Sequence, residues 1–467
     1  MLHVPDWFSC LLQHRPEVLL AGYNVEDEDL RHHLRAFWES YRQENPSHPV
    51  FATHCDHLDS CLPYFLFGDE GRGHRKSPVM IFAFETVLGL RTKAIYEESR
   101  KTDLRGAAQT KALLDAQRHT AKLSSLKSRF LLAVLPHLWY KGKLVHVYRN
   151  TLDAVSVKCQ DLFHAGVQHC GKKFYGVLLG VKGDSPALTK MGMLNRAFNR
   201  LGFDKGICPF CLGGKQNFPW EDMSQEAAWH STIGQVRPWD ANCTNQLLSI
   251  PFSLDVPEFV FRSDPFHVCK YGIGRHFGAS ALVLLASWNT WGAAALNFDE
   301  RMARAFDDFS FCCSKELKGT PHCKAFTRDG LHFDRESSFP WAGWKGSDTM
   351  LVLRWLVRLI RYGIVTDARS GTSLLAEPPG PQELLQFQKD VLEAVLDGAC
   401  SMVRFFQILY HNGAWILSPA CFLAESSEDF IGQVARLARR TSARSTCSRT
   451  IQRYLIKCHF DYKDLTR

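Results

Sequence analysis

Apolar runs bounded by glycine or proline predict buried strands in the first part of the chain. The runs Pro63 to Phe67, Val79 to Leu88 and Phe130 to Leu135 are rich in Phe, Val, Ile and Leu, as buried strands are. A longer run from Phe174 to Val181 and a short one from Phe259 to Phe261 have the same character. We therefore expect five strands, of which three come early.

Elsewhere apolar residues recur every three or four positions, which predicts helices. The expected helical segments are Glu26 to Gln43, His146 to Gln168, the stretch from Asp184 to Leu201, His267 to Leu285, most of 285–417 and Glu428 to Arg440. The polar, basic segment from Glu97 to Arg129 predicts a solvated loop or a loose helix. Strands separated by helices are typical of an α/β protein whose mixed sheet is covered on both faces.

Composition narrows the class of protein. With 467 residues, 45% of them apolar, the chain can bury a large core and suggests two or three domain-sized pieces. Its formal charge of +8 favours an anionic partner only weakly. Its 16 cysteines are too sparse for a disulfide scaffold and the N-terminus has no signal-peptide pattern, so an intracellular, soluble protein is expected. The most apolar stretch, Ala279 to Phe298, falls short of the roughly 20 apolar residues that span a bilayer, so we expect no membrane partner.

Acidic residues follow three of the predicted strands. Asp69 comes after the first, Asp184 after the Phe174 run, and Asp264 after Phe259 to Phe261, with His267 three residues later. Carboxylates leaving neighbouring strands at one edge of a sheet form sites for Mg²⁺ or Mn²⁺, because these ions prefer hard oxygen ligands. Two such ions can activate a water or a 3′-hydroxyl for phosphoryl transfer. The plain alternative is that Asp69 lies in a glycine-rich turn, and that Asp184 and Asp264 cap the helices that follow.

Cys208-Pro209-Phe210-Cys211 has the spacing of half a tetrahedral zinc site. Candidate partners for Cys208 and Cys211 are His169 with Cys170, His230 or Cys243, although none follows at standard spacing. Two free thiols are the alternative. A second, looser group consists of Cys312, Cys313, His322 and Cys323. We expect its cysteines to be buried thiols and not metal ligands.

Basic residues gather in two places. No acid occurs between Asp429 and Asp461, a region that contains Arg436, Arg439, Arg440, Arg444, Arg449, Arg453 and Lys457. Arg354, Arg358 and Arg361 fall on one face of an amphipathic helix from Met350 to Tyr362. Such stripes are typical of phosphate-binding surfaces, but also of ordinary solvated helix faces.

Taken together, these motifs resemble those of DDE-type transposases, whose RNase H-like core is split by a helical insertion. The nearest likeness is to the Kyakuja-Dileera-Zisupton and Plavaka group and to transposase-like proteins of dinoflagellates. The motifs that carry it are Gly68-Asp69-Glu70-Gly71, Gly183-Asp184-Ser185-Pro186, Cys208-Pro209-Phe210-Cys211, Asp264-Pro265-Phe266-His267 and Glu428-Asp429-Phe430-Ile431-Gly432.

The resemblance implies a fold and a site. The fold would be an RNase H-like mixed sheet flanked by helices, interrupted by a large all-α insertion and a small Cys-containing loop. Its parts would be 1–58, an N-terminal helical segment; 59–202, the first part of the core; 203–250, a zinc-knuckle loop; 251–284, the last strand and the D-x-x-H helix; 285–424, the insertion; and 425–467, the final helix and basic tail.

Two Mg²⁺ or Mn²⁺ ions would be held by Asp69, Asp184 and Glu428, with Glu425 or Asp429 as substitutes for Glu428, while Asp264 and His267 support the site. The resemblance also implies DNA as partner, a nuclear location and compatibility with a homo-oligomer. The stretch from His411 to Ala424 before Glu428 is short, and we expect no separate DNA-binding domain before the core. These departures keep open an inactive, domesticated or truncated DNA-binding descendant, as well as an unrelated α/β scaffold.

Overall fold

The structure is a computed structural model. It describes the chain except for residues 91, 95–96, 98–124, 198–205, 240–242, 244, 253–256, 293–295, 336, 371–381, 412–424, 440, 442–444 and 464–467. The chain divides into two compact units, the first made of Met1–Asp264 and His411–Arg467 and the second of Pro265–Tyr410. Each unit has its own buried apolar core. No helix in the described part of the chain has the length and apolar character needed to cross a membrane.

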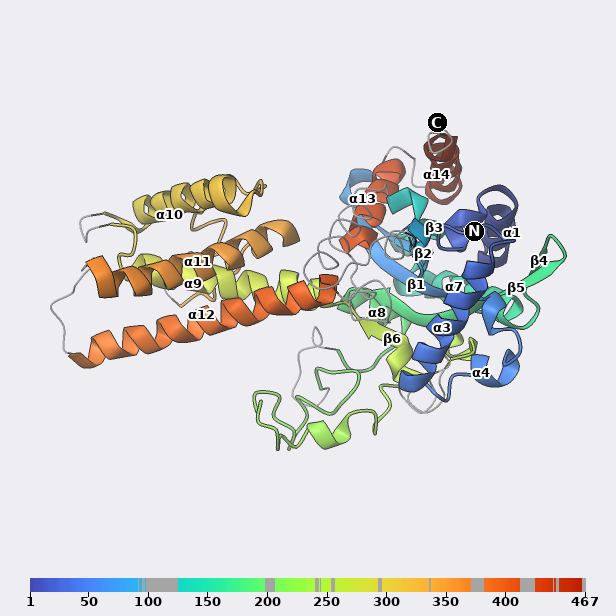
Figure 1. The fold of residues 1–467 in the computed structure, drawn as a ribbon, viewed down its shortest axis with the longest axis horizontal. Helices are drawn as coiled ribbons and strands as arrows, with labels where there is room; N and C mark the ends of the chain where they lie inside the picture. Colours follow the sequence, from blue (N-terminus) through green and yellow to red (C-terminus); the bar gives the residue numbers. More distant parts are fainter. Residues whose placement is uncertain are drawn as a thin grey trace. The chain divides into compact units, whose positions relative to one another are not determined.

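The first unit is built on a mixed sheet (Figure 1). Its strands are β1 (Cys61–Arg72), β2 (Pro78–Thr86), β3 (Arg129–Pro136), β4 (Val167–His169), β5 (Lys172–Gly183) and β6 (Phe261–Ser263). The order along the sheet is β3-β2-β1-β5-β4, and β6 also pairs with β5. β1, β2 and β3 are antiparallel neighbours, whereas β5 is parallel to both β1 and β6. β1, β5 and β6 therefore end at the same edge.

Helices cover both faces of this sheet (Figure 1). They are α1 (Val4–His14), α2 (Pro16–Leu19), α3 (Glu28–Glu44), α4 (Val50–Thr53), α7 (Val145–His164), α8 (Ser185–Met191), α13 (Glu425–Arg439) and α14 (Thr446–Lys463). One face packs against α3 and α13, as Trp38 donates its indole N–H to the Cys61 carbonyl and Phe430 lies edge-on to Phe67. The other face packs against α1, α7 and α8 through Phe8, Leu162 and Met191.

The described elements of the second unit are helical. α9 (Arg275–Ser287) continues from a π-helix (Phe266–Gly274), α10 (Phe298–Cys312) runs into a short π-helical turn (Cys313–Leu317), and α11 (Gly346–Ser370) and α12 (Gln382–His411) follow. An Asn297–Glu300 capping box starts α10. Trp355 of α11 is fully buried among the rings of Trp291, Phe309 and Phe326, which makes it a centre of this core.

The mixed α/β fold predicted from the sequence is confirmed, but several bounds differ. β1 does not stop at Phe67: it continues through Asp69 to Arg72, because Gly68 to Arg72 pair with Pro78 to Phe82 of β2. The helix expected from Asp184 to Leu201 ends at Met191. Neither β4 nor α14 was predicted, whereas β5 was, and α1 lies within the helical segment expected at 1–58. Most of the segment expected to be a loop, 97–129, lies outside the described residues.

Candidate functional site

Three predicted aspartates lie in one row at the edge of the sheet where β1, β5 and β6 end. Phe67 and Lys182 form the last pair between β1 and β5, and Asp69 and Asp184 each follow this pair by two residues. Gly183 pairs with Ser263, so Asp184 also matches Asp264. Neighbouring strands are about 4.8 Å apart, which brings carboxylates from distant parts of the chain close together.

These aspartates also share a face. Side chains alternate along a strand, so Asp69 is on the face of Phe67 and Gly71. That is the α13 face, because Phe67 contacts Phe430 and a Cβ placed on Gly71 would lie 2.7 Å from the Cβ of Ala435. Asp184 is two residues beyond Lys182, the partner of Phe67 on this face. Glu70, by contrast, is on the opposite face and contacts Lys190 of α8.

The aspartates make local hydrogen bonds. Asp69 Oδ1 accepts from the Glu70 N–H at 2.6 Å, and Asp184 Oδ1 accepts from the Ala187 N–H at 2.7 Å. Asp184 is thus the N-cap of α8, as the plainer interpretation predicted, whereas Asp69 is inside a strand and not in a turn. Asp264 is 2% exposed. Among the described residues no three His, Cys, Asp or Glu side chains form a group that could hold a metal ion.

The third predicted ligand, Glu428, is in α13, but its side chain and that of Glu425 lie outside the described residues. Its position precedes Ile431 by three residues and Ala435 by seven, the spacing of one helix face. Ile431 and Ala435 pack against Gly71, so this face of α13 covers β1. Asp429 is engaged elsewhere, since its Oδ2 accepts from Ser125 Oγ at 2.6 Å and from Gln433 Nε2 at 2.7 Å.

A buried charge network lies on the same face of the sheet, where Lys182 precedes Asp184 by two residues. Glu85 of β2 pairs with Lys182 and with Arg129, whose Nη2 is 2.8 Å from Glu85 Oε2. Burial raises the pKa of Glu85, but the positive charges of Arg129 and Lys182 outweigh burial and hold this pKa below its usual value. We did not predict this network. The signal was a lysine inside an otherwise apolar strand, because a lysine that is fully buried is almost always paired.

The supporting residues lie in different elements. Asp264 directly follows β6 and ends the first unit, and His267 is in the π-helix at the start of the second. The His267 ring lies edge-on to the rings of Phe266 and Tyr271.

Cys208 and Cys211 are hydrogen-bonded to one another, and this bond lowers the pKa of Cys211 to about 6 and raises that of Cys208. They lie in the excursion between α8 and β6, residues 192–260. His169 and Cys170 contact each other in the β4–β5 turn, which Figure 1 shows apart from this excursion. Cys243 is among the described residues, between others that are not.

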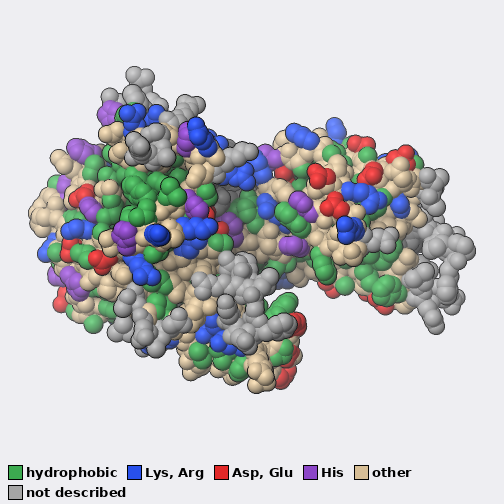
Figure 2. All heavy atoms as spheres, turned by 180° about the vertical axis from the view of Figure 1, so that it is seen from behind, with side chains coloured by type: hydrophobic (Ala, Val, Ile, Leu, Met, Phe, Trp, Pro, Cys, Tyr) green, Lys and Arg blue, Asp and Glu red, His purple; other side chains and the backbone are tan. Residues whose placement is uncertain are grey.

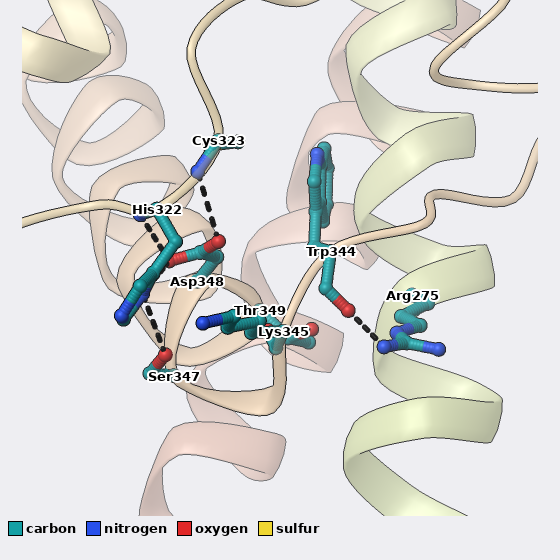
Figure 3. Close-up of polar contacts among 8 residues, drawn as sticks. All are labelled: Arg275, His322, Cys323, Trp344, Lys345, Ser347, Asp348 and Thr349. Atoms are coloured by element: carbon teal, nitrogen blue, oxygen red, sulfur yellow. Dashed lines mark hydrogen bonds and ion pairs between the residues drawn. The ribbon is translucent and has the colours of Figure 1, made fainter. Parts of the chain in front are cut away.

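The residues of the second cysteine group have structural roles. Cys312 and Cys313 are buried free thiols, as predicted. Figure 3 shows the carboxylate of Asp348, at the start of α11, between the backbones of His322 and Cys323. It accepts from their N–H groups at 2.8 and 3.1 Å, and His322 Nδ1 is 3.2 Å from it. Asp348 thereby fixes the loop that contains His322 to α11.

The predicted arginines are partly committed to other groups. Arg358 pairs with Glu316, Arg361 contacts Cys400 Sγ at 3.3 Å and Arg439 donates to the Arg72 carbonyl. Arg354 and Arg436 are exposed, while Arg440 and Arg444 lie outside the described residues. On the face shown in Figure 2, basic side chains occur in separate groups interspersed with acidic ones.

Comparisons of the chain with family models, with curated proteins and with solved structures gave no match. Its function is therefore argued from the sheet and its carboxylates.

Proposed function

We propose that this chain is a transposase, or a protein derived from one, that cleaves and transfers DNA strands with a divalent metal ion. The family proposed is the one its motifs resemble, the DDE-type transposases of the Kyakuja-Dileera-Zisupton and Plavaka kind. DNA would be the partner and the nucleus the place of action.

The observation that carries the proposal is the matched position of Asp69 and Asp184 on neighbouring parallel strands. An RNase H-like core requires its first strand, which contains one aspartate, to lie beside the strand that ends at the second. β1 and β5 are such neighbours, and the register Phe67 to Lys182 aligns the two acids. The two acids are 115 residues apart in the sequence, and the parallel pairing of β1 with β5 brings them to one end of the sheet.

The position of α13 supports the same interpretation. Ile431 and Ala435 contact the position of Gly71, two residues beyond Asp69 on the same face of β1. The helix that contains Glu428 therefore covers the face with the aspartates. Asp69, Asp184 and Glu428 would hold Mg²⁺ or Mn²⁺, and Asp264 adds a buried carboxylate beside them. Two bound ions would supply activation of a water or a 3′-hydroxyl and stabilisation of the leaving oxygen.

The experiment is cleavage and end-joining of branched and plasmid DNA by the full chain with Mg²⁺, Mn²⁺ or a chelator. We expect Asp69→Asn and Asp184→Asn to reduce product to the chelator background. Asn is as good an N-cap as Asp, so Asp184→Asn removes the charge and keeps the start of α8. Glu70→Gln is the matched control, because Glu70 is next in β1 but on the opposite face. Cleavage that survives Asp184→Asn would contradict the proposal.

A second function, binding DNA without chemistry, is favoured by two observations. The Asp184 carboxylate is occupied as a helix cap, and the described side chains form no metal-binding group. Such a protein would bind DNA through arginines such as Arg354 and Arg436 and would lose affinity steeply as salt rises. Strong, salt-dependent binding without metal-dependent cleavage by the wild type would favour this descendant over the enzyme.

A further inference from the structure

The loop at Cys208 and Cys211 has a geometry that free thiols do not need. Cys208 Sγ accepts a hydrogen bond from the Phe210 N–H at 3.3 Å, and Cys211 Sγ accepts one from the Gly213 N–H at 3.4 Å. Each sulfur thus receives an N–H from the residue two positions later. Backbone donors aimed at sulfur stabilise a thiolate, which is the form that binds metal.

His230, a candidate third ligand, lies in a segment that is hydrogen-bonded to the cysteine loop. The Leu212 N–H donates to Thr232 Oγ1 at 2.9 Å and the Gly234 N–H donates to the Phe210 carbonyl at 2.9 Å, so the segment with His230 is fixed against the cysteine loop. His230 Nδ1 is 3.1 Å from the Gln225 carbonyl.

One buried guanidinium holds both segments. Arg196 is 3% exposed and donates to the carbonyls of Cys208 and Pro209 at 3.0 Å and to those of Val236 and Arg237 at 2.5 and 3.2 Å. The excursion is joined to α8 as well, because the Trp239 indole N–H donates to the Gly192 carbonyl at 2.6 Å. The loop is therefore built into the fold, and its far end is fixed next to the helix that Asp184 caps.

We propose that Cys208, Cys211 and His230 bind one Zn²⁺ ion, with water or a further donor completing the tetrahedron. The thiolates and imidazole are ligands that zinc prefers. His230 is exposed and is not gathered with the two sulfurs in the described structure, so binding requires its ring to turn toward them. The ion would cross-link two parts of the excursion between α8 and β6, and this structural role would not depend on any DNA chemistry.

The test is metal content and Co²⁺ spectroscopy of the full chain purified under reducing conditions. We expect one zinc per chain, and a Co²⁺ form with sulfur-to-cobalt charge-transfer bands. Cys211→Ser should weaken those bands because one of the two thiolates is lost. His230→Ala should weaken zinc binding by at least about tenfold, the smaller end of the loss seen even for residues around a metal site. Cys170→Ser is the matched control, since Cys170 is a cysteine beside a histidine at another place.

If Cys211→Ser does not fold, the test is made on the wild-type protein. A chelator should remove its zinc and change its tryptophan fluorescence, because Trp229 adjoins His230. Protein without zinc, a Cys208–Cys211 disulfide under the same reducing conditions, or unchanged affinity in His230→Ala would each overturn the proposal. DNA cleavage is not a readout here, so the zinc site and the proposed enzyme can fail separately.

Discussion

At the scale of single residues, the buried Glu85 connects three strands of the first unit. Glu85 is 7% exposed and Lys182 1%, and their pairing lies just before the row of aspartates. Removing one member of a buried ion pair leaves an uncompensated charge and costs about 3 to 5 kcal/mol. The network therefore fixes β2, β3 and β5 together at the base of the candidate site.

We expect Glu85→Gln to lower the free energy of unfolding at neutral pH by about 3 to 5 kcal/mol, because Lys182 and Arg129 lose their shared counter-ion. The pKa of Glu85 is lowered in the fold, so its stabilisation is present above the unfolded pKa of about 4.3 and is lost as pH falls through the lower folded value. Urea titrations from pH 7 to pH 3 should therefore show the gap between wild type and variant narrowing in acid. Arg35→Gln, which removes an exposed ion pair, is the control. Equal stability at pH 7 would contradict this role.

At the scale of elements, the packing of α13 on β1 decides whether the late acids reach the aspartates. A Cβ on Gly71 would lie 2.7 Å from Ala435 Cβ, closer than side-chain atoms pack. We expect Gly71→Val to push α13 from the sheet, lower stability by about 1 to 3 kcal/mol and increase hydrogen exchange in α13. Gly89→Ala is the control, since a Cβ there meets nothing within 4 Å. Unchanged protection of α13 in Gly71→Val would mean that the helix is not held by this contact.

The sequence pattern was sufficient for elements whose signal is local. The helix expected from Glu26 to Gln43 is α3, and the strands expected at Val79 and Phe130 are β2 and β3. The continuation of β1 through Asp69 was not predictable in this way, because glycines disfavour strands and only pairing with β2 extends it. Likewise, the sequence supplied Asp69 and Asp184 but not their register, which depends on a pairing between residues more than 100 positions apart.

At the scale of the whole molecule, each cluster of buried apolar residues lies entirely in one unit or the other, which implies two units of stability. The second unit buries Trp355, which donates its indole N–H to Asp308 at 3.0 Å, and the first buries Trp38, which donates to the Cys61 carbonyl at 3.0 Å. Neither tryptophan belongs to the other core. Regions with separate cores can open separately, each with its own free energy.

We therefore expect Trp355→Ala to destabilise the second unit by about 3 to 5 kcal/mol and to leave the first unchanged, because the cavity would remove contacts only within the helical core. Hydrogen exchange measured by mass spectrometry should show faster exchange in α9 to α11 but not in β1 or β5. Trp38→Ala is the reciprocal variant and should give the opposite pattern. Loss of protection in both units from either change would show that they unfold as one cooperative body, and the aspartates would then depend on the helical unit for their stability.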